Sequence, residues 1–219
     1  MKYVIAVATL LFSSSLFAQV LAVNTFQPLP GGMPQSLAYA AEAKAIHEAM
    51  GAGVSIGVTT EGNMDYAVAF ENWEAYGQWL MALNSNERWL AFQAKISGSP
   101  SATQIDNRML TSIAQGTPPG SGALYQVYMW EPGSGAGAVQ NLMQGGIGAK
   151  PIHENRGANV SVYRDALNKM YYVMTWPDAA SWGRFQDTPI PEFQAYMQSL
   201  DTTGPGAATL MQVTTGTLQ

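Results

Sequence analysis

Two stretches of this chain repeat each other at a fixed offset, and this duplication constrains the fold more than any other feature. Residues 43–48 (AKAIHE) align with residues 149–154 (AKPIHE), an offset of 106 residues, and residues 51–55 (GAGVS) align with residues 157–161 (GANVS). The two histidines of the chain, His47 and His153, fall at matching positions. Such self-similarity is typical of a chain built from repeated structural units.

The beginning of the chain has the layout of a secretory signal peptide. Lys2 supplies a positive charge, residues 4–12 are apolar, and Ala18 is a small residue at which cleavage is expected. The apolar run is too short for a membrane span, which needs about 20 apolar residues. Cleavage after Ala22 is the alternative, but the first strand of the repeat is expected to begin near Val20. We therefore predict a signal peptide at 1–18 and a periplasmic or extracellular protein, with no membrane insertion after cleavage.

Composition narrows the classes of partner. The chain has no cysteine, 10 Lys and Arg residues against 15 Asp and Glu residues, and a formal net charge of −5. Thiol nucleophiles and cysteine metal sites are therefore absent, and nucleic acid is not an expected partner because it requires clustered positive charge. Six Trp, ten Tyr and twelve Met residues supply much large apolar surface.

Within each repeat, hydrophobic periodicity alternates between the strand and helix patterns. In the first repeat it predicts a strand at 20–27, a helix at 34–50 ended by Gly51, a hairpin at 54–60 and 64–70, a helix broken near 84–86, and a strand at 102–111. The second repeat has the same order, with its last helix broken at 188–191. This β-α-β-β-α-β order is that of a ferredoxin-like unit. We predict an α+β protein with repeats at 19–114 and 123–219, joined by a Gly/Pro-rich linker at 115–122.

The aromatic-rich broken helices carry a family resemblance. Residues 182–187 (WGRFQD) and 191–196 (PEFQAY) surround the break in the second repeat, and Trp79 with residues 87–92 (ERWLAF) echo them in the first. In this the chain resembles the dimeric α+β-barrel superfamily, in its fused two-repeat form. The resemblance implies two tandem ferredoxin-like repeats that form an intramolecular α+β barrel. Such folds serve cofactor-free monooxygenases, polyketide cyclases, isomerases, haem-handling proteins and proteins without known activity, so the fold alone does not select a function.

A register argument locates a candidate pocket. If the second hairpin turns at Leu167 and Asn168, Tyr172 pairs with Tyr163, and the small β-branched residues Val160, Val162, Val173 and Thr175 face the helices. The opposite face then carries Met and aromatic side chains and faces its counterpart across the barrel; a one-residue slip would exchange the faces. The candidate ligand-binding residues on that face are Met64, Tyr66, Phe70, Tyr163, Met170, Tyr172, Met174 and Trp176. They could line a pocket for a small apolar or aromatic molecule between the two sheets, or they could fill a closed core.

The two His-Glu pairs are interpreted as structural. Adjacent residues on a helix point about 100° apart, and neither repeat offers a further histidine nearby, so no metal site is expected. Both histidines precede a helix-ending glycine, where an imidazole can interact with free carbonyl groups, and we expect them to lie away from the cavity. Haem binding would require a histidine inside the barrel. No cofactor is therefore expected.

Two function classes remain. The first is a protein that binds a small apolar or aromatic ligand without chemistry, which the lack of a convergent catalytic set favours. The second is a cofactor-independent monooxygenase, cyclase or isomerase on an aromatic or polyketide-like substrate, with Tyr163, Tyr172 or Asp165 moving protons. A homodimer is compatible with either class.

Overall fold

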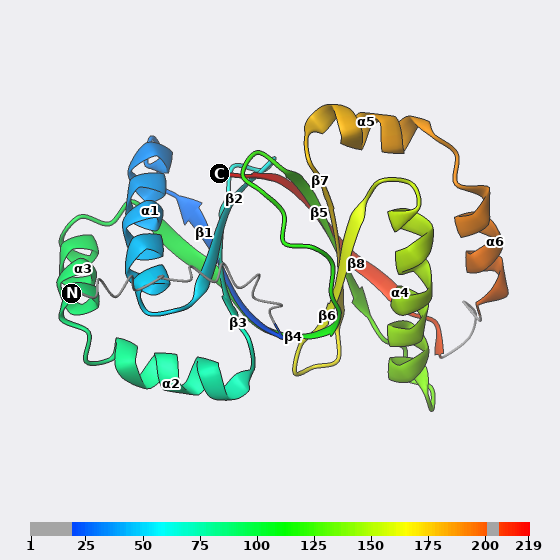
Figure 1. Ribbon diagram of the computed structural model, residues 1–219, viewed down its shortest axis with the longest axis horizontal. Coiled ribbons are helices and arrows are strands. Elements are labelled where there is room, and N and C mark those ends of the chain that lie inside the picture. The colour runs from blue at the N-terminus through cyan, green and yellow to red at the C-terminus, as the bar shows by residue number, and fades with distance from the viewer. Residues whose placement is uncertain (1–18, 201–205) are drawn as a thin grey trace, which may run out of the picture.

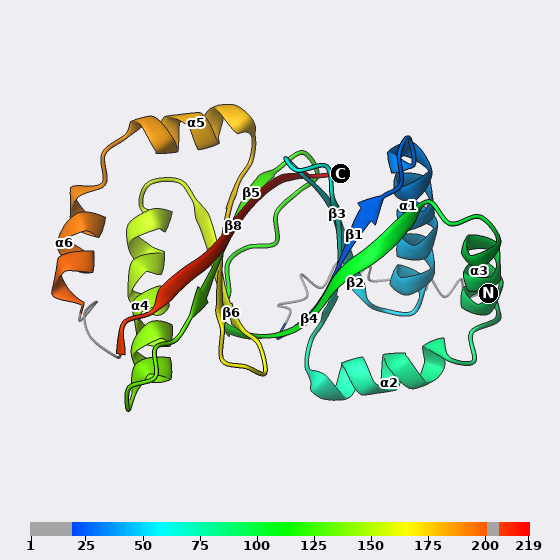
Figure 2. The same ribbon diagram turned by 180° about the vertical axis from the view of Figure 1, so that it is seen from behind.

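The computed structural model describes residues 19–200 and 206–219, so the predicted signal peptide lies outside the described residues. The chain forms a closed barrel of antiparallel strands in the order β1-β3-β2-β8-β5-β7-β6-β4. In Figure 1 the strands occupy the middle of the molecule, with helices α1 to α3 covering one outer side and α4 to α6 the other. Figure 2 shows the same arrangement from behind. The fold is therefore α+β, as predicted.

The first half runs β1 (Val20–Pro28), α1 (Met33–Ala49), β2 (Gly53–Thr59), β3 (Met64–Phe70), α2 (Trp73–Leu83), α3 (Glu87–Gly98) and β4 (Ala102–Ala114). The second half runs β5 (Leu124–Glu131), α4 (Ala138–Glu154), β6 (Asn159–Arg164), β7 (Met170–Trp176), α5 (Ala179–Asp187), α6 (Pro191–Ser199) and β8 (Thr209–Leu218). The predicted element order is confirmed in both halves, including the two broken helices. Each half also has equivalent strand neighbours, β4-β1-β3-β2 in one and β8-β5-β7-β6 in the other.

Local chemistry explains where the helices begin and end. The side chains of Asn72, Asn86 and Asp178 each accept a hydrogen bond from a backbone N–H three residues later, at the starts of α2, α3 and α5. Gly51 and Gly157 follow α1 and α4 with φ of 87° and 91°, a left-handed conformation that glycine adopts without strain.

Two joints close the barrel. Residues of β2 pair with β8, where Val58 lies opposite Thr217, and residues of β4 pair with β6, where Ser112 lies opposite Tyr163. At both joints an edge strand of one half pairs with an edge strand of the other half, so neither half-sheet keeps a free edge.

The hydrophobic cores lie outside the barrel, between each half-sheet and its own helices. Buried residues of α1 pack on β1, β2 and β3, and those of α4 pack on β6 and β7. No helix of the described chain is long and apolar enough to cross a membrane.

The predicted orientation of β7 is wrong. Tyr163 pairs with Tyr171 and Val162 with Tyr172, one residue away from the expected register. The hairpin turns through a three-residue loop rather than two, with Asn168 in the left-handed region at φ 63°. The odd loop length exchanges the two faces of β7, so Met170, Tyr172, Met174 and Trp176 face the helices, while Val173 and Thr175 line the barrel interior.

The same holds in the first half. Gly62, 106 residues before Asn168, has φ 81° and supplies the left-handed residue of the equivalent loop. Met64, Tyr66 and Phe70 were predicted to lie between the two sheets, but they are buried against the helices. The predicted positions on β6 hold: Val160 and Val162 face α4, and Tyr163 lines the barrel interior.

Candidate functional site

Three cavities are present in the described part of the chain. The barrel interior encloses about 220 Å³, and its walls are small apolar residues with a few polar groups. A cavity of about 660 Å³ lies between the second half-sheet and α4 to α6, and one of about 580 Å³ lies between the first half-sheet and α1 to α3. The two outer cavities, here called the second-half and first-half cavities, are each large enough for a small organic molecule.

The barrel interior carries a polar network that joins the two half-sheets. Asp65 accepts hydrogen bonds from the hydroxyls of Thr25 (2.7 Å) and Tyr125 (2.9 Å), while Arg108 donates to Thr25 and lies over the ring of Tyr171. Burial raises the pKa of Tyr125 above its usual value, so its hydroxyl stays protonated. Because Tyr125 of β5 donates to Asp65 of β3, the network connects the two halves of the barrel.

The candidate ligand-binding residues are divided among these spaces. Met170, Tyr172 and Met174 line the second-half cavity, and Met64 and Tyr66 line the first-half cavity. Tyr163 lines the barrel interior. Phe70 and Trp176 are buried in the cores behind the cavities, and Trp176 is only 1% exposed.

A buried histidine lines each outer cavity. His153 Nδ1 is 2.7 Å from the hydroxyl of Tyr172, and His47 Nδ1 is 3.0 Å from the hydroxyl of Tyr66. The exposed fractions of His153 and His47 are 6% and 4%. Neither histidine lines the barrel interior, as expected, but each lines an outer cavity and contacts a tyrosine, so the interpretation of both as helix-end caps is wrong.

The sequence held a signal for this placement. Ser36, Ala40, Ala43 and His47 recur at the spacing of one helix face, and all four are buried. The position of the two histidines near a helix end suggested capping, but each histidine is also the last residue of the buried helix face that packs on the sheet. Leu142, Ala149 and His153 form the matching stripe of α4.

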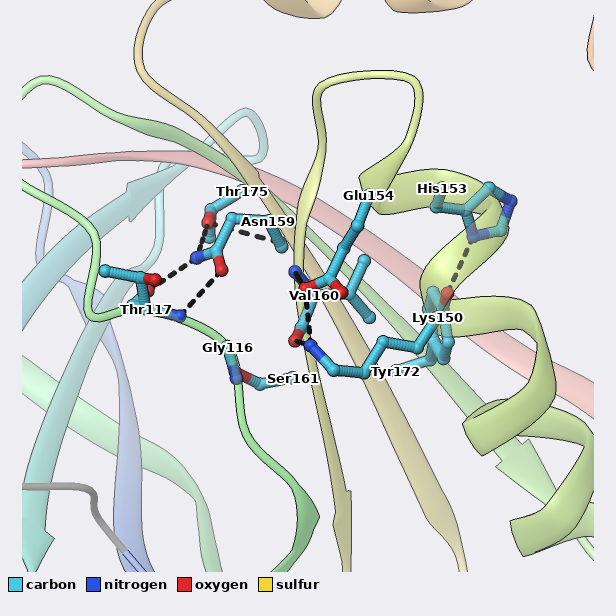
Figure 3. A network of polar contacts seen from close by, with 10 residues as sticks. All are labelled: Gly116, Thr117, Lys150, His153, Glu154, Asn159, Val160, Ser161, Tyr172 and Thr175. Atoms are coloured by element: carbon cyan, nitrogen blue, oxygen red, sulfur yellow. Dashed lines mark hydrogen bonds and ion pairs between the residues drawn. The ribbon is translucent and has the colours of Figure 1, made fainter.

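A lysine near the end of each histidine-bearing helix connects that helix to the neighbouring strand, an arrangement here called the helix-end lysine clamp. Lys150 Nζ forms an ion pair with Glu154 and donates to the Val160 carbonyl of β6 at 2.7 Å (Figure 3). Lys44 makes the equivalent contacts, with Glu48 and with the Val54 carbonyl of β2 at 2.7 Å. These lysines bind the helix end to the neighbouring strand.

Electrostatics keep both His–Tyr pairs neutral. Burial lowers the pKa of His47 to about 4 and lowers that of His153 from its usual value, because a charged imidazolium loses hydration there. Burial raises the pKa of Tyr66 and of Tyr172, so both remain protonated phenols. At neutral pH each pair is thus an uncharged imidazole next to an uncharged phenol.

Aromatic rings enclose His153, and sequence analysis did not identify them as site residues. The ring of Phe193 lies 4.5 Å from that of His153, and the ring of Phe185 lies 5.8 Å from it, measured between centroids. Tyr196 approaches from α6 and donates to the Gly145 carbonyl at 3.0 Å. These residues belong to the broken helix that carried the family resemblance.

Metal binding has no support in this arrangement. Among the described residues, no group of three His, Cys, Asp or Glu side chains is placed to hold a metal ion. Each outer cavity offers one imidazole, whereas a structural zinc site uses four ligands.

Known proteins resemble this chain in structure but not in sequence. No protein-family model matches the chain, and no curated protein matches its sequence. The structure is similar to a protein from Lactobacillus acidophilus provisionally assigned as a monooxygenase, with a TM-score of 0.59, 13% identity, and coverage of 92% of this chain and 94% of that one. A provisionally assigned monooxygenase from Fusobacterium nucleatum has a TM-score of 0.60 at 13% identity and 92% coverage of both chains. An anthrone oxidase-like protein has a TM-score of 0.53 at 11% identity and 91% coverage of both.

The chain has the α+β-barrel fold of these proteins. At identities this low the likeness extends to the fold alone, and the activity must be argued from the cavities.

Proposed function

We propose that this protein binds a small, uncharged, apolar or aromatic molecule in its second-half cavity. The observation that carries the proposal is the lining of that 660 Å³ space. Among the described residues it contains Trp130, Met170, Met174, Phe185 and Phe193, but no Asp, Glu, Lys or Arg. A charged ligand would lose its hydration there without gaining a partner, whereas an apolar one would gain from burial.

The helix facing the cavity supports the proposal. α4 contains Gly145, Gly146 and Gly148, although each glycine inside a helix costs about 1 kcal/mol relative to alanine. Gly146 and Gly148 leave room for Met170 and Tyr196, since a Cβ at either position would clash with those side chains. A Cβ on Gly145 would meet only Leu200, at 3.6 Å, so this glycine opens the cavity and is not required for packing.

Polar groups at the cavity wall can orient the ligand. Tyr128, His153, Tyr172 and Gln186 all line the space, and Tyr172 already engages His153. A few hydrogen-bonding groups within a largely apolar lining are typical of small-molecule sites.

The proposal also includes a tandem duplication and export from the cytoplasm. The repeated residues and the equivalent strand order of the two halves support a tandem duplication of a ferredoxin-like unit. The charged, apolar and small-residue zones of residues 1–18 support export to the periplasm or the exterior.

A second candidate function is cofactor-independent oxygenation, cyclisation or isomerisation. It is favoured by the neutral His153 next to Tyr172, since the Tyr172 hydroxyl can take a proton from a substrate as it passes its own proton to His153 Nδ1. Structural neighbours provisionally assigned as monooxygenases, and one described as anthrone oxidase-like, are compatible with it.

Native mass spectrometry of the protein from its natural host tests the binding function. We expect a small molecule to co-purify with the wild-type protein and to be lost in Gly145→Tyr. This variant fills the cavity with a tyrosine, the residue that the first half has at the equivalent position, Tyr39. The control is Gly183→Ala on α5, because Gly183 has open space around it and does not line the cavity. This variant also removes a helix glycine but should retain the molecule.

The same measurement reports whether the protein is a monomer or a homodimer. Equal retention by wild type, Gly145→Tyr and Gly183→Ala would show that the second-half cavity is not the site. Oxygen uptake on addition of anthrone, without added cofactor and lost in His153→Gln, would favour the catalytic function over binding alone.

A further inference from the structure

The first-half cavity differs from the second-half cavity in its polar groups. It lies between β1, β3 and α1 to α3 and is walled by aromatic side chains that include Tyr66, Trp79, Trp89 and Phe92. Its described lining residues include no Asp, Glu, Lys or Arg. The cavity therefore suits an uncharged molecule with aromatic surface.

Two buried nitrogen atoms at this cavity have no hydrogen-bond partner within the described chain. They are His47 Nε2 and Trp79 Nε1, and both residues line the cavity. The centroids of the two rings are 5.1 Å apart, so one small ligand can reach both nitrogens. A buried polar group left unpaired costs about 1–3 kcal/mol, which makes two such groups side by side unusual in a folded protein.

Both nitrogens are donors. An indole nitrogen can only donate. At His47, Nδ1 lies 3.0 Å from the Tyr66 hydroxyl, and the phenol can use its single hydrogen only if Nδ1 accepts it. The neutral imidazole then carries its hydrogen on Nε2, so His47 and Trp79 each have an unpaired N–H donor at the first-half cavity.

The second half shows what distinguishes the Trp79 donor. Phe185 lies 106 residues after Trp79, but Trp176 lies 106 residues after Phe70, so each half has one indole in this pair of packed rings. Trp176 Nε1 is also buried without a partner within the described chain. Trp176 lines none of the three cavities described above, whereas Trp79 lines the first-half cavity, so the N–H of Trp79 is the one that a bound molecule can meet.

We propose that the first-half cavity is a second binding site, which takes an uncharged aromatic molecule bearing a carbonyl oxygen that accepts hydrogen bonds from His47 Nε2 and Trp79 Nε1. The aromatic part of the ligand packs among Trp79, Trp89 and Phe92. The site lies on the opposite side of the barrel from the second-half cavity, so it does not depend on the function proposed for that cavity.

Matched probes test this site in the full-length protein. They are 2-acetonaphthone, which has a carbonyl, 2-ethylnaphthalene, which has a similar shape without one, and 2-naphthoate, which is charged. The second-half cavity is closed by Gly145→Tyr in all the proteins compared, so that it does not take up the neutral probes. In this background we expect 2-acetonaphthone to bind about tenfold or more tightly than either of the others, as measured by calorimetry. Trp79→Phe, which copies Phe185, should reduce the preference over 2-ethylnaphthalene to about threefold or less while the protein stays folded.

Indole ¹⁵N labelling gives a second, structural readout. The Trp79 N–H signal, assigned by its loss in Trp79→Phe, should move downfield when 2-acetonaphthone binds and stay in place with 2-ethylnaphthalene. Gly145→Tyr should leave this response unchanged, since it alters only the second-half cavity.

Three outcomes would overturn the inference. They are equal affinity for the two neutral probes, tighter binding of 2-naphthoate, and a Trp79 N–H signal that does not respond to bound 2-acetonaphthone. Failure of the Gly145→Tyr experiment would instead concern the second-half cavity and leave this site standing.

Discussion

At the scale of single residues, burial decides the chemistry of the two histidines. Each is held against its half-sheet by the helix-end lysine clamp and engaged by a tyrosine on β3 or β7. In such surroundings the neutral imidazole is the stable form, because burial removes the hydration of a positive charge and the described lining residues include no carboxylate. Proton binding by these histidines is therefore coupled to unfolding.

The protein should lose stability as the pH falls from about 6.5 to 4. An unfolded histidine titrates near 6.5, whereas folded His47 titrates at about 4, so between these values the unfolded chain binds a proton that the folded chain does not. Stability thus rises with pH across this window, and His47 accounts for about 3 kcal/mol of the change. Urea unfolding at several pH values measures it.

His47→Phe is the matched variant for this effect. It should show a smaller loss of stability on acidification, with a remaining part due to His153, whose pKa is lowered in the same direction. An unchanged pH dependence in His47→Phe would mean that the acid sensitivity arises from other groups, His153 or the carboxylates.

At the scale of elements, the hairpin loops determine what each strand face meets. Gly62 and Asn168 occupy the left-handed position of two equivalent three-residue loops. In the second loop, Asp165 Oδ1 also accepts hydrogen bonds from the backbone N–H groups of Leu167 and Lys169, both at 2.9 Å. The odd loop length places the Met and aromatic face of β7 toward the helices and creates the wall of the second-half cavity.

Substitution at Asn168 should follow the cost of a left-handed backbone. Asn168→Val is expected to lower the free energy of unfolding by about 1–2 kcal/mol, since a residue with a branched Cβ is strained at φ 63°. Asn168→Gly, which copies Gly62, should leave stability equal or higher. Thermal unfolding of the pair provides the test, and equal destabilisation by both would point instead to a lost side-chain contact.

At the scale of the whole molecule, the linker between the halves forms part of the barrel. Asn159 of β6 accepts from the Thr117 N–H at 2.7 Å and donates to the Thr117 carbonyl and to Thr175 Oγ1, while Gly116 donates to Ser161 (Figure 3). Residues 115–119 also line the barrel interior. The side chains of Asn159 and Ser161 thus help to hold the connection in place.

Loss of this side chain should release the linker. Asn159→Ala removes all three hydrogen bonds of the amide and should reduce stability by about 1–3 kcal/mol. Limited proteolysis should then cut within residues 115–122 faster than in wild type. Asn159→Asp keeps the acceptor for the Thr117 N–H and should be intermediate; a linker equally resistant in all three proteins would show that the strand joints alone hold it.

The sequence by itself determined the order of strands and helices and the α+β fold, because these follow from hydrophobic spacing along the chain. It also identified the Met and aromatic residues of β3 and β7 as one continuous face. Only the tertiary structure decided which way that face points, since one additional loop residue exchanges the two sides of a strand. It likewise decided that His47 and His153 lie in cavities, because a residue near a helix end can serve as a cap or face the sheet, and the choice depends on the sheet that packs against it.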